Sequence, residues 1–327
     1  MYPIKFKSLY YEKIWGGRGL QSFRDDLPDG NIGESWDVAC RSNGMSIVSN
    51  GEFKDMKFDE LIKKMGDKIV GTKIDRHRFP LLIKLINATQ KLSIQVHPDD
   101  EYANKVENEM GKTEVWYVIE ALPGASLIVG TKNECSIDEF KKGIKTGTLE
   151  KFLNKIPVKK GDVYFIKSGM VHAICEGLVL AEIQQNSDVT YRVYDYNRGR
   201  ELHVKKALDV INFNLKPKKS TGLKIQRDGY AKTYLCFSRE FSLELYDISK
   251  EALEHSDRER FYIFTCVDGC GDIIYDGGAE PIKKGDSVLI PASLGKYSLK
   301  GKMKLLRSYV PNFDKLEKSI LSEVEKI

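Results

Sequence analysis

The chain has 327 residues, of which 41% are hydrophobic, 30% charged and 10% aromatic. Lys and Arg outnumber Asp and Glu by 52 to 47, and this excess of +5 falls well short of the clustered basic charge of nucleic-acid-binding proteins. The length allows about two domains, and the composition excludes a disordered or a membrane-spanning chain. We therefore expect neither a nucleic-acid partner nor a membrane partner.

The N-terminal segment and the cysteines predict the compartment. Lys5, Lys7, Glu12 and Lys13 interrupt the segment in which a signal peptide would need an apolar stretch. The six cysteines contain no CxxC pair, and an even count does not make a disulfide framework in a long chain without a secretion signal. The sequence predicts reduced thiols and a cytoplasmic protein.

In chain order, helical periodicity is expected first at 57–70 and then at 99–110, 136–153 and the C-terminus. Short β-branched and aromatic runs dominate elsewhere, and Gly, Pro, Asn or Asp bound them. The clearest runs are 115–130, 161–169, 241–249, 260–269 and 285–293. Such spacing is typical of antiparallel sandwiches or barrels. In the C-terminal helix one face is apolar and is expected to pack on a sheet, through Phe313, Leu316, Ile320, Val324 and Ile327.

An internal repeat predicts the domain organisation. The tetrapeptide Lys-Lys-Gly-Asp occurs at 159–162 and at 283–286, within two similar segments. A weaker similarity precedes each copy, at 114–124 and at 259–269. The polar, Pro- and Gly-containing segment between 212 and 223 reads as a linker. We therefore predict an N-terminal catalytic domain over 1–214, with small helical segments, and a C-terminal domain over 215–327.

Four residues of the first copy form a candidate metal site. Gln95 and His97 are two apart, so on a strand both side chains project from the same face. Glu114 opens the next predicted strand, and His172 lies at the end of the repeated segment. Neutral imidazole, carboxylate and amide oxygen together suit a divalent cation such as Zn²⁺ with an open water position.

The segment ending at His172 resembles the second half of the cupin signature, with Gly161, Gly169 and His172 in place and Lys167 where the signature has proline. The first half departs more, since Gln95 replaces a histidine. This resemblance implies a mainly β fold, with two cupin (jelly-roll β-barrel) domains and a few peripheral helices. In the second copy Lys296 takes the place of His172, and an ammonium group is no metal ligand, so the C-terminal domain is predicted to be metal-free.

The motifs SIQVHPDD, GKTEVWYV, MVHAI and AEIQQNSDVTYRVYDYNR, with IWGGRGL and IGESWDVA near the N-terminus, resemble the short bacterial form of type I mannose-6-phosphate isomerase (phosphomannose isomerase). The resemblance implies a zinc enzyme that interconverts D-mannose 6-phosphate and D-fructose 6-phosphate, with one Zn²⁺ per chain. It places the zinc ligands on Gln95, His97, Glu114 and His172. It places the catalytic arginine on Arg192, and polar residues of the active cleft on Ser93, Lys112, Glu182 and Asp188.

Aldose–ketose isomerisation moves a proton between C2 and C1 through an enediol, so negative charge develops on the sugar oxygens. We expect Zn²⁺ to polarise these oxygens or hold the active-site water, and Arg192 to stabilise the enediolate. Lys112 and Ser93 are candidates for the phosphate end. The carbon base is not identified by the sequence, and Glu182 is the best matched carboxylate. Whether Gln95 ligates the metal directly also stays open.

Two alternatives compete with the isomerase. A cupin oxygenase would use iron and two histidines at the first ligand pair, which Gln95 disfavours. A sugar-phosphate-binding cupin module without catalysis is the second alternative. The expected partner is a small sugar phosphate, and we expect a monomer or a weak homodimer. The remaining histidines, His77, His203 and His255, lack partners at useful spacing and are interpreted as surface or loop residues.

Overall fold

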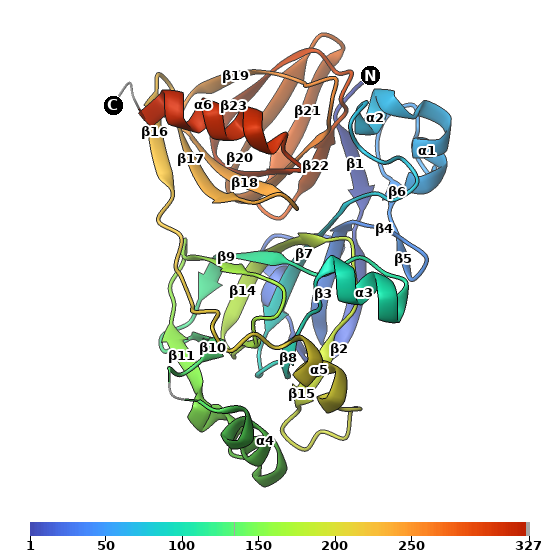
Figure 1. The fold of residues 1–327 in the computed structure, drawn as a ribbon. Helices are drawn as coiled ribbons and strands as arrows, with labels where there is room; N and C mark the ends of the chain where they lie inside the picture. The colour runs from blue at the N-terminus through green and yellow to red at the C-terminus, as the bar shows by residue number, and fades with distance from the viewer. Residues whose placement is uncertain (134, 325–327) are drawn as a thin grey trace.

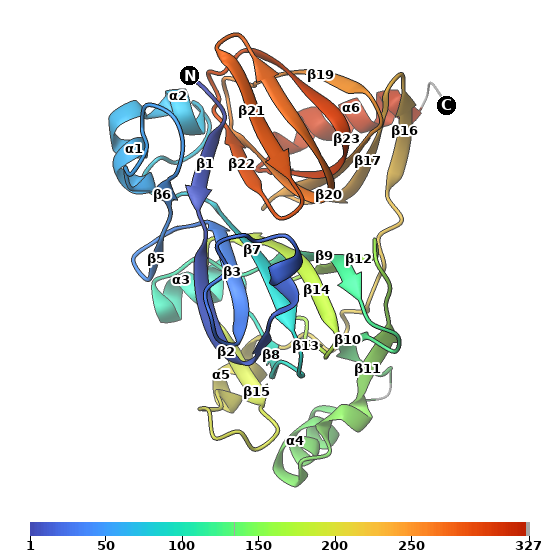
Figure 2. The ribbon, with the colours of Figure 1, turned by 180° about the vertical axis from the view of Figure 1, so that it is seen from behind.

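The computed structural model describes residues 1–133 and 135–324. Two halves rich in strands lie one above the other, with short helices on their outside (Figure 1, Figure 2). The predicted mainly β class with a few peripheral helices is confirmed. Among the described residues, the helices are too short or too polar to cross a membrane.

The N-terminal half contains two packed antiparallel sheets. Side chains from both, such as Trp116, Leu127 and Ile174, share one apolar core. The six-stranded sheet has the order β12 (Val163–Ile166), β9 (Glu114–Ala121), β14 (Leu178–Gln185), β7 (Leu81–Ala88), β3 (Ile32–Val38) and β2 (Leu9–Gly17). The five-stranded sheet has the order β11 (Leu153–Pro157), β10 (Ser126–Thr131), β13 (His172–Ile174), β8 (Ile94–Val96) and β15 (Tyr191–Tyr194). A hairpin of β4 (Cys40–Arg41) and β5 (Gly44–Met45) lies beside them.

The C-terminal half is one ten-stranded sheet to which the start of the chain contributes. Its central order is β16 (Leu223–Arg227), β17 (Tyr230–Phe237), β18 (Ser242–Ile248), β23 (Lys296–Tyr309), β20 (Tyr262–Tyr275), β22 (Ser287–Ile290), β1 (Ile4–Lys7) and β6 (Ile47–Val48). Two further strands, β19 (Glu251–His255) and β21 (Gly278–Lys283), pair with β23 and β20. Ile4 lies opposite Leu289. The predicted division at residue 215 falls in the segment that links the two halves. The strand β1, although it lies at the start of the chain, belongs to the sheet of the C-terminal half.

The two Lys-Lys-Gly-Asp segments form the same turn. Gly161 precedes β12 and Gly285 precedes β22, with φ of +88° and +96°, a region that favours glycine. The carboxylates of Asp162 and Asp286 each accept a hydrogen bond, at 3.2 Å, from the backbone N–H three residues earlier. The sequence repeat thus corresponds to a structural repeat.

The helices lie near the predicted positions. They are α1 (Phe58–Met65), α2 (Asp67–Val70), α3 (Asp100–Glu107), α4 (Ile137–Thr146), α5 (Val204–Val210) and α6 (Phe313–Val324), with 3-10 turns at Gly19–Ser22 and Leu149–Phe152. A capping box of Ser136 and Glu139 starts α4. Helix α5 was not predicted. In α6, Phe313 stacks on Phe237 of β17 at 4.2 Å, but no side chain is fully buried and Val324 is 47% exposed. Ile327 lies outside the described residues.

A buried charge network crosses the C-terminal half. Arg307 of β23 donates to the carboxylate of Glu244 at 2.8 Å and to that of Glu254 at 3.1 Å. Lys232 lies 3.1 Å from Glu244, and the Tyr309 hydroxyl donates to Glu244 at 2.7 Å. Glu244 is inaccessible to solvent and Arg307 is 6% exposed. Every charge in this network has an opposite charge in contact, as buried ionic groups require.

Candidate active site

The ends of the three strands β8, β9 and β13 bring the predicted metal ligands together. Glu114 is the first residue of β9 and His172 is the first residue of β13. His172 pairs with Gln95 across β13 and β8. His97 directly follows β8, and the next residue, Pro98, has no N–H with which to continue the strand.

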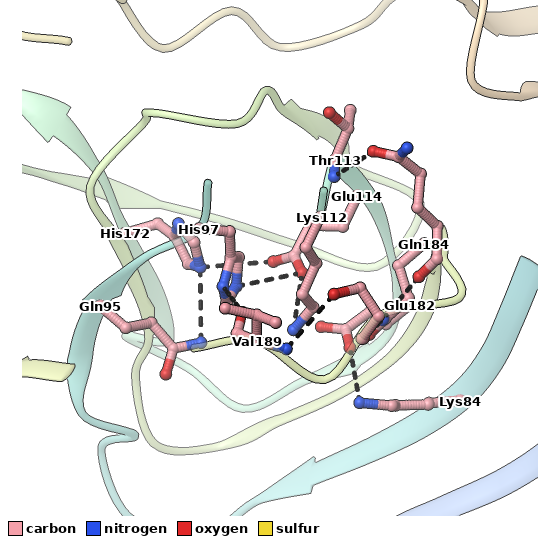
Figure 3. Close-up of polar contacts among 12 residues, drawn as sticks. Lys84, Gln95, His97, Lys112, Thr113, Glu114, His172, Glu182, Gln184 and Val189 are labelled. Carbon is pink, nitrogen blue, oxygen red and sulfur yellow. Dashed lines mark hydrogen bonds and ion pairs between the residues drawn. The ribbon is translucent and has the colours of Figure 1, made fainter. Parts of the chain in front are cut away.

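The ligand atoms of His97, Glu114 and His172 all lie within 4.8 Å of one another, and the three residues are buried. The Nε2 atom of His97 is 3.5 Å from Glu114 Oε2, and that of His172 is 3.4 Å from Glu114 Oε1. Figure 3 shows the two imidazoles and the carboxylate converging on one point. This is the only such group of three among the residues that the structure describes.

The backbone fixes the tautomer of both histidines. Nδ1 of His97 lies 2.8 Å from the carbonyl of Val189, and Nδ1 of His172 lies 2.8 Å from that of Met170. A carbonyl can only accept, so each Nδ1 carries the proton and each Nε2 presents a lone pair. Burial, together with the nearby Lys112 ammonium, lowers the pKa of His97 well below its usual range. Burial lowers the pKa of His172 to about 4. Both imidazoles are neutral at pH 7, as metal ligation requires.

The buried polar atoms fit a divalent cation. His97 Nε2 and both carboxylate oxygens of Glu114 have no hydrogen-bond partner, although such atoms are costly to bury unpaired. Two imidazoles and a carboxylate form a usual donor set for Zn²⁺. The amide of Gln95 adjoins them, with Nε2 at 3.5 Å from His172 Nε2. A half-turn of this amide would direct its oxygen toward the same point.

A pocket of about 290 Å³ adjoins this group and collects the other predicted residues. Gln95 and Lys112 line it and also contact the ligand residues, since Lys112 Nζ lies 3.3 Å from Glu114 Oε2. The remaining predicted residues in its wall are Ser93, Glu182, Asp188 and Arg192. One cavity thus brings together six residues that lie between positions 93 and 192 of the chain.

Each of these side chains has a defined partner. The hydroxyl of Ser93 donates to the Gln95 amide oxygen at 3.2 Å. Glu182 accepts from the indole N–H of Trp116 at 3.0 Å, and burial, with the Glu114 carboxylate nearby, raises its pKa. Asp188 accepts from the side chain of Asn43 at 3.0 Å.

Arg192 is held by two segments of the chain that the sequence did not link to it. Its guanidinium donates to the carbonyl of Glu201 at 2.8 Å, and its Nε has no hydrogen-bond partner. Its backbone N–H donates to His203 Nδ1 at 3.3 Å. His203 lies in the loop before α5, which fits its interpretation as a surface or loop residue, but it does not lack a partner, because its ring accepts this hydrogen bond from the strand that carries Arg192.

The comparisons with known proteins identify the family. Residues 4–117 match the family described as phosphomannose isomerase type I, catalytic domain, and residues 230–310 match the cupin domain of mannose-6-phosphate isomerase. The mannose-6-phosphate isomerase ManA of Bacillus subtilis is 38% identical over 94% of this chain and 99% of its own length. The chain belongs to the type I phosphomannose isomerase family. The predicted family membership is confirmed.

Other members are similar over the same length. The mannose-6-phosphate isomerase of Streptococcus mutans is 35% identical over 94% of this chain and 98% of its own length. A crystal structure of the mannose 6-phosphate isomerase from Bacillus subtilis superposes with a TM-score of 0.88 at 35% identity, over 94% of this chain and 99% of that one. This phosphomannose isomerase family member thus shares the two-part architecture of its relatives.

The sequence reasoning missed a row of alternating charges beside this pocket. Lys84 of β7 lies 3.5 Å from Glu182 and 3.7 Å from Glu34 of β3, and Glu34 lies 3.3 Å from Lys13 of β2. Lys84 is buried in a strand whose other residues are uncharged, LLIKLINA. A lysine in an otherwise apolar strand is the sequence feature that could have revealed it.

This row predicts an acid-dependent stability. Burial alone would raise the pKa of Glu34, but the ammonium groups of Lys84 and Lys13 outweigh it and lower the pKa to about 2. A depressed pKa means that the carboxylate stabilises the fold fully above about pH 4.5 and loses this contribution as the pH falls toward about 2. Glu34→Gln should therefore show a shallower fall of the unfolding free energy in this window. Urea unfolding at a series of pH values measures the slope, and equal slopes in both proteins would contradict the assignment.

Proposed function

We propose that this chain is a zinc-dependent aldose–ketose isomerase that interconverts D-mannose 6-phosphate and D-fructose 6-phosphate through an enediol. The observation that carries the proposal is the buried group of His97, Glu114 and His172 beside a pocket lined by Lys112 and Arg192. A metal group and two cations together suit a phosphorylated sugar whose oxygens gain negative charge during the reaction. The names of the relatives support the same substrate pair.

His97, Glu114 and His172 would hold the metal, with Gln95 as the candidate fourth ligand. When bound, Zn²⁺ would act as a Lewis acid toward the sugar oxygens or their water. The chain's own contribution is to keep both imidazoles neutral and oriented through the carbonyls of Val189 and Met170.

The pocket residues supply proton transfer, charge stabilisation and substrate binding. Glu182 is our candidate for the carboxylate that transfers the proton between C2 and C1, because burial raises its pKa toward the range of an efficient general base. Arg192 stabilises the enediolate through its guanidinium. Lys112, with Ser93, binds the phosphate end or supports the developing charge, and Asp188 binds sugar hydroxyls.

The Arg192→Ala variant separates metal binding from turnover. Its metal content should equal that of the unchanged protein, because Arg192 contacts none of the three ligands. Its kcat should fall by about 10²–10³, since it loses a charge-stabilising donor of the transition state. Metal analysis and steady-state kinetics measure the two quantities. A variant that lost its metal, or one that raised only KM, would contradict the role given to Arg192.

A coupled assay tests the function itself. Metal-replete protein should convert mannose 6-phosphate into fructose 6-phosphate without consuming oxygen. Oxygen consumption with bound iron would identify a cupin oxygenase, and sugar-phosphate binding without turnover would identify a binding module. Either result would overturn the proposal.

We also propose the wider assignments that go with this function. A catalytic domain over 1–214 and a metal-free domain over 215–327 agree with the single metal group found in the described residues. A cytoplasmic location agrees with the six free cysteines, because thiols stay reduced in that compartment. The small sugar phosphate is the partner, and the expected state is a monomer or a weak homodimer, which sedimentation velocity measures.

A further inference from the structure

A second pocket, separate from the candidate active site, lies on the N-terminal half. It has a volume of about 380 Å³, which is within the range of small-molecule sites. Its walls come from the β4–β5 hairpin, helix α1, the segment 76–79 and residues that follow α3 and β14, namely Glu109 and Asn186. Five basic side chains line it, namely Arg41, Lys63, Arg76, His77 and Arg78.

The charge of this pocket is unbalanced. Two carboxylates line it, and each has a basic partner, because Asp59 lies 2.9 Å from Lys63 and Glu109 lies 2.9 Å from Arg41. The side chains of Arg76 and Arg78 have no hydrogen bond or ion pair with any residue in the described ranges 1–133 and 135–324. Two guanidinium groups on one exposed segment are therefore free to bind an anion.

We propose that this pocket is a second anion site that binds a small phosphorylated molecule and is coupled to the candidate active site. The planar guanidinium fork matches phosphate oxygens in a bidentate manner, and two arginines separated by a single residue can share one phosphate group. Arg41 is the fixed part of the site, since Glu109 and the carbonyl of Asn186 hold it. The side chains of Arg76 and Arg78 are exposed and lack such partners, so they can turn toward a bound anion.

Short contacts connect the two pockets. The side chain of Asn186 donates to the carbonyls of Cys40, at 3.1 Å, and Phe79, at 2.8 Å, so it joins the hairpin to the segment that carries the arginines. Asp188, two residues further, lines the candidate active site and accepts from Asn43 in the turn of the same hairpin. An anion that draws Arg76 and Arg78 inward thus acts on a hairpin that also positions Asp188.

Equilibrium dialysis with radiolabelled inorganic phosphate tests the site independently of catalysis. The double variant R76A/R78A should bind one phosphate per chain fewer than the unchanged protein. A charge-matched control, K224A/K302A, removes two exposed cations of the C-terminal half and should bind the same number as the unchanged protein. Equal binding by R76A/R78A, or an equal loss in the control, would overturn the proposal.

Inhibition by phosphate tests the coupling. In the unchanged protein, inorganic phosphate should lower kcat as well as compete with the sugar phosphate. In R76A/R78A the effect on kcat should disappear and the competition should stay, because Arg76 and Arg78 lie outside the candidate active site. An effect on kcat that persists in the variant would refute the coupling. A chain without isomerase activity would refute the proposed function and leave the dialysis result to decide on the site.

Discussion

The His172→Ala variant is expected to lose both metal binding and the proposed isomerase activity. His172 supplies one of three buried ligand atoms that converge within 4.8 Å, and alanine leaves two. A Lewis acid contributes several kcal/mol to transition-state stabilisation, and a loss of about 4 kcal/mol lowers the rate by about a thousandfold. Metal analysis of the purified protein and the coupled assay measure the two losses in one preparation.

The control for this variant is His255→Ala. His255 is an exposed histidine of β19 in the other half of the molecule, so its removal should change neither metal content nor turnover. Circular dichroism checks that both variants are folded. Full activity of His172→Ala would show that the three buried residues do not form the catalytic metal site.

The Arg307→Met variant is expected to be the most destabilising single change in the C-terminal half. Arg307 contacts the carboxylates of Glu244 and Glu254, and its guanidinium lies over the rings of Tyr246 and Tyr262 at 5.1 and 4.7 Å. Methionine of similar length leaves Glu244 buried with less positive charge around it. Removing one partner of a buried ion pair costs about 3–5 kcal/mol, which urea unfolding measures.

Two further variants define the cause. Arg258→Met removes an exposed arginine from the same half and should change the unfolding free energy by less than about 0.5 kcal/mol. The double variant E244Q/R307M should recover part of the loss, because glutamine removes the buried negative charge that Lys232 alone would have to balance. The double variant could instead lose as much unfolding free energy as the two single variants lose together, or more. In that case the burial of a poorly compensated charge would not be the cause.

The sequence predicted the ligands of the candidate metal site better than their surroundings. His97, Glu114 and His172 lie at strand ends that both periodicity and the family motifs identify, so their convergence could be expected. The surroundings depend on contacts between distant strands, which periodicity does not encode. Lys84 is an example, because its function depends on Glu34 and Glu182 from the two strands beside it.

The fold shows the same difference. The repeat predicted two similar β units, and its turns at Gly161 and Gly285 correspond in detail. The pairing of β1 with β22 could not be predicted, because the four residues Ile4–Lys7 are too few for a periodic pattern and do not indicate which strand pairs with them. Helix α5 was missed for a similar reason, since its seven residues span about two turns.

The place of β1 also governs how the chain is made. β1 can pair with β6 early, through Phe6 and Val48, but Ile4 lies opposite Leu289, so its second neighbour, β22, is made only near the end of synthesis. Until then the edge of β1 that faces β22 stays available to other chains, and a fragment that begins at residue 215 leaves the matching edge of β22 open. The two halves are therefore separate in architecture, but the sheet of the C-terminal half is complete only when both ends of the chain have been synthesised.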